Sequence, residues 1–157
     1  MIILLYPTAH NRHREEHLRL LLAIVCLAGF VPASIGQTAN TFKIRLSPVP
    51  LDATMRATVT GKGAAAATLS GNKLTIDGTF EGLASPATIA QIHQSKVTGI
   101  RGPVVTDITV SKAASGTVSA SLTLTPEQID ALRKGRLYIQ IHSEKAPDGN
   151  LWGWLLK

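Results

Sequence analysis

The sequence predicts an all-β domain of antiparallel strands with one short helix near its C-terminal end. Apolar and polar residues alternate over about eight or nine short segments, and a period of two is typical of strands with one buried face. Glycine, proline, asparagine and serine separate these segments, as turns do in sandwiches and barrels. The helical crossovers of a parallel sheet are missing, so the pattern favours an antiparallel sandwich or a closed barrel.

The strand segments follow one another along the chain. In the first, Phe42, Ile44 and Leu46 alternate with basic residues, and two prolines end it because proline cannot donate to a ladder. Four alanines from Ala64 onward would suit a helix by propensity, but the flanking glycines leave too little length for one. Strands are expected at 42–46, 55–60, 64–69, 74–80, 88–93, 104–110, 117–124, 137–142 and 151–155.

A short helix is expected just before the strand at 137–142. Thr125 can cap it, and Pro126 suits the first helical position because its missing N–H would be unpaired there. Gln128 is placed to complete a capping box, and Gly135 can take the left-handed conformation that stops the helix. These four residues therefore predict a helix that leads directly into a strand.

The strand at 137–142 is expected to have one apolar and one polar face. The apolar face would consist of Leu137, Ile139 and Ile141, and the polar face of Tyr138, Gln140 and His142. A turn at Pro147-Asp148-Gly149 is expected to join it to the last strand as a hairpin.

Two histidines of the expected domain, His93 and His142, lie at strand ends on the more polar face. If their strands are neighbours, Gln91, Tyr138 and Gln140 share one surface with them. Two imidazoles within ligand distance would form half of a copper or zinc site. The carboxylates that could complete it are Asp107, Glu144 and Asp148. Ordinary hydrogen bonding and no cofactor is the favoured interpretation, and metal binding is the alternative.

Trp152 and Trp154 share one face of the last strand. Burial in the core is favoured, since aromatic rings usually serve burial, and this would leave Leu151 and Leu155 on the other side. The alternative is a flat binding surface for a sugar or a partner protein.

The residues give no positive indication of an enzyme. A triad could be assembled from either histidine with Ser95 or Ser143, but no nucleophile-elbow spacing surrounds these serines. The net charge of +6 comes from dispersed basic residues. Because no basic run alternates with aromatic residues, nucleic acid is not an expected partner.

Residues 1–36 are expected to be a signal peptide and leader, which leaves a domain at 37–157. Basic residues up to Arg19 precede an apolar run at 20–31, and small residues follow as far as Gly36. The run is shorter than the roughly 20 residues of a membrane helix, and an uncleaved anchor is the alternative. The mature protein would then have no stable membrane span.

Cys26 lies in this leader, so the exported domain would contain no cysteine. That excludes a disulfide framework, thiolate catalysis and cysteine-bound zinc. Lipid attachment at Cys26 is a weaker alternative, because Val25 before it is bulkier than such sites favour. A secreted or periplasmic protein of the cell envelope is therefore expected.

Several ordered motifs resemble the CHRD domain, which is named for chordin and occurs in bacterial exported proteins. The match runs from about Thr41 to Lys157, and its motifs lie at 74–83, 90–93, 102–105, 122–128 and 135–156. The resemblance implies an immunoglobulin-like, Greek-key β-sandwich and an extracellular binding role. The family often has two histidines two residues apart, where this chain has Gln91 and His93. Trp152 and Trp154 replace an arginine and a glutamine, so no role of that arginine is carried over.

The sequence thus predicts a secreted or periplasmic binding or structural module without catalytic activity. Its partner would be an extracellular protein or glycan. The alternative is a copper- or zinc-binding envelope protein that uses His93 and His142.

Overall fold

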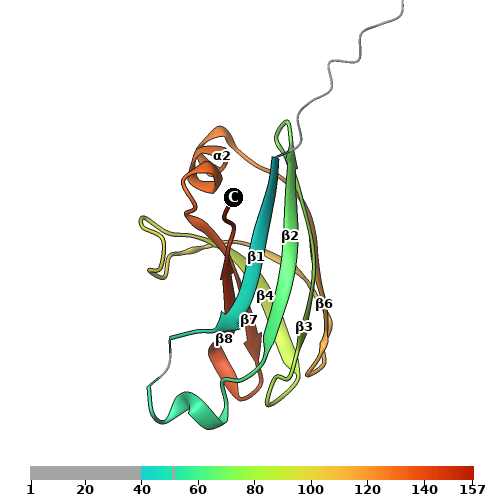
Figure 1. Cartoon of the computed structure of the whole chain (residues 1–157), viewed down its shortest axis with the longest axis vertical. Helices are drawn as coiled ribbons and strands as arrows, with labels where there is room; N and C mark the ends of the chain where they lie inside the picture. Colours follow the sequence, from blue (N-terminus) through green and yellow to red (C-terminus); the bar gives the residue numbers. More distant parts are fainter. Residues whose placement is uncertain (1–39, 51) are drawn as a thin grey trace, which may run out of the picture. The chain divides into compact units, whose positions relative to one another are not determined.

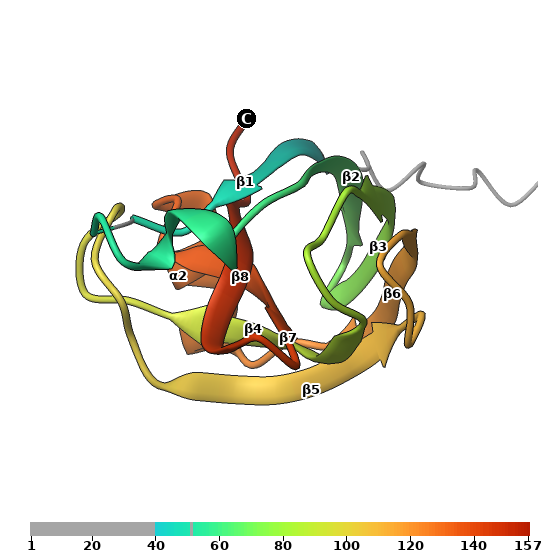
Figure 2. The same cartoon turned by 90° about the horizontal axis from the view of Figure 1, so that it is seen from below.

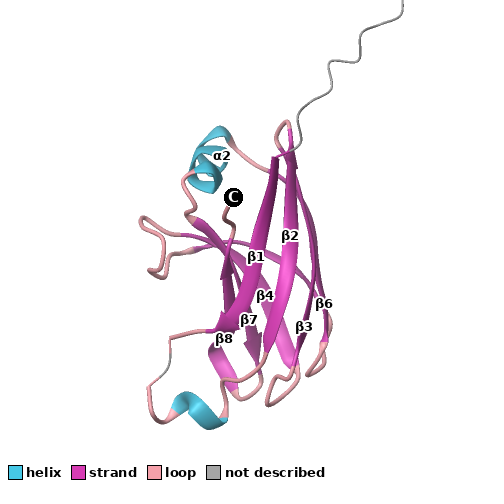
Figure 3. Ribbon diagram, viewed as in Figure 1, coloured by secondary structure: helices cyan, strands magenta, loops and turns pink. Residues whose placement is uncertain are grey.

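The computed structural model of the chain describes residues 40–50 and 52–157, so the predicted leader at 1–36 lies outside the described residues. Within them, antiparallel strands close into a barrel in the order β1-β2-β3-β6-β5-β4-β7-β8 (Figures 1 and 2). Figure 3 shows these strands together with short helical segments. The strands are β1 (Asn40–Pro48), β2 (Lys62–Ser70), β3 (Lys73–Glu81), β4 (Ala87–Gln94), β5 (Val104–Val110), β6 (Gly116–Thr123), β7 (Leu137–Ser143) and β8 (Ala146–Trp154).

The all-β prediction is confirmed, but the immunoglobulin-like Greek-key sandwich is wrong. β8 pairs with β7 on one side and with β1 on the other, which closes the sheet. A sandwich and a barrel both give every strand one buried face, so alternation along the chain is the same in both. Only the pairing of the first strand with the last separates them, and no local pattern records it.

Two short seams join the two halves of the barrel. Between β5 and β6 the register is Thr109↔Ser119 and Val110↔Val118, and between β1 and β8 it is Ser47↔Trp152 and Pro48↔Leu151. We call the two parts the β1–β2–β3–β6 half and the β5–β4–β7–β8 half. Within each half the strands pair over longer stretches.

Aliphatic side chains fill the barrel interior. Leu137, Ile139 and Ile141 of β7 are fully buried there, as the alternation predicted. Burying one such side chain contributes about 1.5–3 kcal/mol. Leu151 and Leu155 from the last part of the chain belong to the same cluster. The interior therefore contains Leu151 and Leu155, which were expected on the side of the last strand that faces away from the core.

The helix α2 (Pro126–Arg133) has the predicted capping box. Thr125 Oγ1 accepts from the Gln128 backbone N–H, and the Gln128 side chain accepts from the Thr125 N–H. Gly135 has φ of 64°, as expected for the residue that stops the helix. The helix buries Leu132 and delivers the chain into β7.

The strand predicted at 55–60 is wrong, because this segment begins with a 3-10 helix, η3 (Met55–Ala57). The Asp52 carboxylate accepts from Thr54 N–H and Oγ–H and from Met55 N–H, which fixes a local turn before a strand can form. Val49 and Val59 then pack with Ala146 in a small second cluster outside the barrel.

The turn predicted at 147–149 is also displaced. The β7–β8 hairpin turns at residues 144 and 145, where Ser143 pairs with Ala146. The next aligned pair is Ile141 with Leu151, so residues 147–150 bulge opposite His142 alone. The Pro-Asp-Gly sequence therefore makes a bulge inside β8.

Candidate functional site

Strands β4, β7 and β8 lie side by side, and their outward side chains form rows. The register places these residues opposite one another: Trp154, Tyr138 and His93 in one row, and Trp152, Gln140 and Gln91 in the next. His142 lies beside them, with its ring centre 6.5 Å from that of His93. The structure thus brings together the seven side chains singled out from the sequence. We call this set the imidazole–indole face; its role stays a prediction.

A loop after β4 fixes His93. Its Nδ1 lies 3.0 Å from the carbonyl oxygen of Gly102, and the Gly102 N–H donates to the Tyr138 hydroxyl at 3.0 Å. Tyr138 stacks on the imidazole with ring centres 4.8 Å apart. A Cβ on Gly102 would meet the Gln94 carbonyl at 2.0 Å, so only glycine lets the loop approach this closely.

The bulge in β8 fixes the other two polar side chains. His142 Nδ1 lies 2.7 Å from the Pro147 carbonyl oxygen, and Gln140 Nε2 donates to the Asp148 carbonyl at 3.1 Å. Gly149 has φ of 124°, and a Cβ there would meet Gln140 Nε2 at 2.5 Å. The misplaced turn sequence is therefore what supplies these carbonyl oxygens.

The partners of the two imidazoles determine their protonation. A carbonyl oxygen only accepts, so each Nδ1 carries a proton, and in the neutral form of each ring Nε2 then presents a lone pair. The lone pair of His142 accepts a long bond of 3.4 Å from Gln140 Nε2. His93 Nε2 and Gln140 Oε1 are buried without a hydrogen-bond partner.

Burial has the largest effect on the pKa of His93, a residue that is 7% exposed. It lowers the pKa of His93, the bond to Gly102 offsets part of this, and the charges of His142 and Arg101 lower the pKa further. The imidazole is therefore neutral at pH 7, with its Nε2 lone pair available.

The tryptophans do not lie in the core, so the favoured interpretation from the sequence is wrong. Both are partly exposed on the outside of β8, and Trp152 packs against the small cluster of Val49 and Val59. Their rings are inclined by 68°, with centres 5.6 Å apart, so they do not form one flat platform. The ring centres of Tyr138 and Trp154 are 4.5 Å apart, and Tyr138 is fully buried.

The structure assembles neither a carboxylate-containing metal site nor a catalytic triad from the predicted groups. Among residues 40–50 and 52–157, no three histidine, cysteine, aspartate or glutamate side chains group around a possible ion. Asp107 instead accepts from Gln91 Nε2 at 2.8 Å. The Ser95 hydroxyl donates to the Val97 carbonyl and the Ser143 hydroxyl to Asn150 Oδ1, so neither serine donates to an imidazole.

Sequence reasoning missed the segments that cover this face. They are the loop between β4 and β5 and the bulge at 147–150. A hydrogen bond of 2.6 Å from Arg101 Nη1 to the Asp148 carbonyl oxygen connects the loop to the bulge. Glycine at 102 and 149 was the available signal, because close backbone approach favours glycine.

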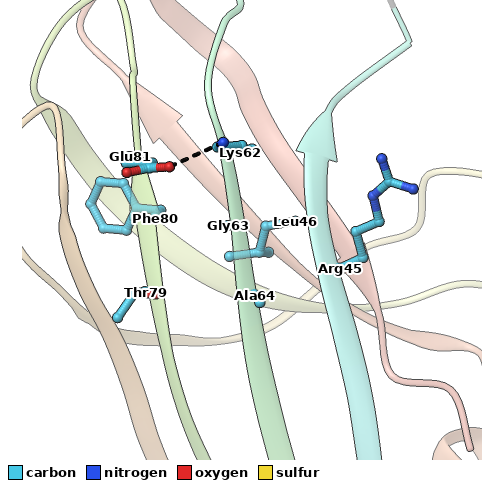
Figure 4. Close-up of a pocket in the computed structure, with 8 residues that line it drawn as sticks. All are labelled: Arg45, Leu46, Lys62, Gly63, Ala64, Thr79, Phe80 and Glu81. Carbon is cyan, nitrogen blue, oxygen red and sulfur yellow. Dashed lines mark ion pairs between the residues drawn. The ribbon is translucent and has the colours of Figure 1, made fainter.

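A surface hollow on the other half of the barrel offers less chemistry (Figure 4). Its charged contact is the ion pair of Lys62 and Glu81, 3.3 Å apart, whose side chains are 78% and 64% exposed. Such pairs contribute little, and Figure 4 shows Arg45 extending away from this one. The hollow is lined by Arg45, Leu46, Lys62, Gly63, Ala64, Thr79, Phe80 and Glu81.

In the part of the chain that the structure describes, no helix has the length and apolar character needed to cross a membrane. No curated protein and no solved structure matches the chain significantly. A family model, the CHRD domain, matches residues 45–155, which include every residue of the imidazole–indole face. The chain therefore belongs to the CHRD domain family.

Proposed function

We propose that the chain is an exported, non-catalytic module that binds an extracellular glycan or protein segment through the imidazole–indole face. Membership of the CHRD family suggests a binding or structural module. The observation that carries the proposal is the position of Trp152 and Trp154, which lie partly exposed outside the barrel. Aromatic rings beside a few fixed polar groups are typical of ligand sites.

The arrangement of the rings favours a ligand that enters a corner. The two indoles meet at 68°, and Gln91, whose amide is held by Asp107, lies two strands away in the row of Trp152. A sugar ring or an apolar side chain can contact both indole surfaces, and a ligand that extends across β7 can bond the partly exposed amide of Gln91. Because tryptophan and tyrosine often dominate binding energy, few contacts would suffice.

The test is binding of the purified chain to glycan and peptide arrays. We expect Trp154→Ala to lose binding at least about tenfold, since a dominant aromatic contact contributes 2 kcal/mol or more. Thr75→Ala is the control, because Thr75 is exposed on β3 in the other half of the barrel. Equal binding by Trp154→Ala and the parent chain would contradict the proposal, and the array that responds identifies the ligand class.

A further inference from the structure

We propose that His93, His142 and Gln140 form a binding site for one copper(II) ion. This inference does not rest on the proposed glycan or protein ligand, because it uses buried polar atoms and not the exposed indoles. Its starting point is a pair of acceptors, His93 Nε2 and Gln140 Oε1, which are buried and lack hydrogen-bond partners.

Unpaired buried acceptors are costly to the fold. Each costs about 1–3 kcal/mol when no donor reaches it. The two residues are 7% and 2% exposed, and both lie on the imidazole–indole face beside His142. Neither acceptor can satisfy the other, because both present lone pairs. A cation or a molecule that donates two hydrogen bonds would satisfy both.

The tautomers of the two histidines favour a cation. Nδ1 of each ring is held by a backbone carbonyl, of Gly102 for His93 and of Pro147 for His142. Metal-binding histidines usually donate their other ring N–H in this way, which fixes the ring and leaves Nε2 to the metal. Copper would displace only the 3.4 Å contact from Gln140 Nε2 at His142.

If the two Nε2 atoms face each other across one ion, the spacing of the ring centres matches copper better than zinc. With bonds of about 2.0 Å, two imidazoles on opposite sides of one ion have ring centres about 6.4 Å apart, against about 5.2 Å in a tetrahedral site. The observed separation of His93 and His142 is 6.5 Å. Opposite ligands suit the tetragonal geometry of copper(II), whereas zinc prefers a tetrahedron.

The donor set points in the same direction. Two neutral imidazoles and one amide oxygen lack the carboxylates that magnesium and calcium prefer. Imidazole suits copper, nickel and zinc, and copper(II) binds most tightly in this series. Water would occupy the positions that Gln140 Oε1 leaves open.

The test uses the full chain with copper(II) alone as the probe. Three further histidines could also bind copper, so the parent for this experiment carries H10Q, H13Q and H17Q. We expect one copper per chain by titration calorimetry, and a paramagnetic resonance spectrum with two imidazole nitrogens. His93→Gln and His142→Gln should each weaken binding at least about tenfold, and Gln140→Leu should weaken it less.

The controls separate loss of ligands from loss of fold. The far-ultraviolet circular dichroism spectrum of each variant must match that of the parent. If His93→Gln unfolds, the result for His142→Gln is used instead, since His142 is only partly buried. Thr75→Ala should bind copper as the parent does. Absence of copper binding would overturn the proposal. Binding that survives both histidine substitutions, or zinc bound more tightly than copper, would overturn it too.

The two proposals fail separately. Trp154→Ala should keep copper binding while it loses the glycan or peptide, because Trp154 belongs to the exposed indole pair and not to the copper ligands. Loss of copper in Trp154→Ala with an intact fold would contradict the ligand set assigned here.

Discussion

The two halves of the barrel share one architecture and differ on their outer surfaces. On β3, the outward residues Thr75, Asp77 and Thr79 are exposed to solvent. On β7, the outward residues Tyr138 and Gln140 are buried almost completely. Both strands are central in their halves, so pairing does not explain the difference. The β5–β4–β7–β8 half is covered on its outer side by the loop after β4 and the bulge in β8.

The difference shows that the covered half contains buried polar groups that a stable fold does not require. Covering a polar outer surface costs desolvation unless every group finds a partner. The covered half holds His93 Nε2 and Gln140 Oε1 without partners, whereas apolar residues there would avoid that cost. The covered half is where we propose that ligands bind, whereas the exposed half completes the barrel.

The largest expected effect comes from matched truncations on the two outer surfaces. Tyr138→Ala should lower the free energy of unfolding by about 3–5 kcal/mol, as large buried aromatic residues do. Thr75→Ala, at an outward position of the other half, should change it by less than about 0.5 kcal/mol. Urea unfolding measures both. Similar losses in the two variants would remove the contrast between the halves.

A smaller effect should follow from the glycine in the bulge. Gly149→Ala places a Cβ against Gln140 Nε2 and forces a non-glycine residue to φ of 124°. We expect a loss of about 1–3 kcal/mol in the free energy of unfolding. Gly99→Ala is the matched control, because its φ is 90° but no atom lies within 4 Å of the added Cβ. Equal losses would show that strain alone is involved, without the contact to Gln140.

A further difference should appear on acidification. The unfolded chain protonates His93 near the ordinary pKa of about 6.5, whereas burial lowers the pKa in the folded barrel. The free energy of unfolding should therefore fall as the pH drops from about 6.5 toward the lower folded value, and this contribution changes no further below it. The groups that also act on His93 are His142 and Arg101.

Urea unfolding at pH 7.5 and pH 5 measures this effect in a metal-free buffer. His93→Gln removes the titrating group, so its free energy of unfolding should fall less between the two pH values than that of the parent chain. If both chains lose the same amount, other groups cause the acid sensitivity.

Local sequence patterns predicted elements better than they predicted closure. The capping box of Thr125 and Gln128 and the alternation of Leu137, Ile139 and Ile141 act within a few residues, so the sequence displays them directly. Pairing of β1 with β8 joins residues about a hundred positions apart and leaves no such pattern. The pattern therefore left sandwich and barrel open, and the resemblance to the CHRD domain implied the sandwich.

The candidate site was predicted in part. Placing His93 and His142 on the polar faces of their strands required only alternation, whereas the pairing of β4 with β7, which brings them together, was left open. The carbonyl partners from Gly102 and Pro147 depend on backbone paths that residue types do not specify. The tryptophans were misplaced because their size favours burial, while the small Gly153 fits between strands inside the barrel.

The most direct test of the central claim is a long-range proton–nitrogen NMR spectrum of the histidine side chains at pH 7. In the metal-free full chain, assigned with His93→Gln and His142→Gln, we expect both rings to carry the proton on Nδ1 and to have an unprotonated Nε2. Copper(II) should then broaden these two signals first. A proton on Nε2 of His93 would contradict the account, because the lone pair on which the site depends would be absent.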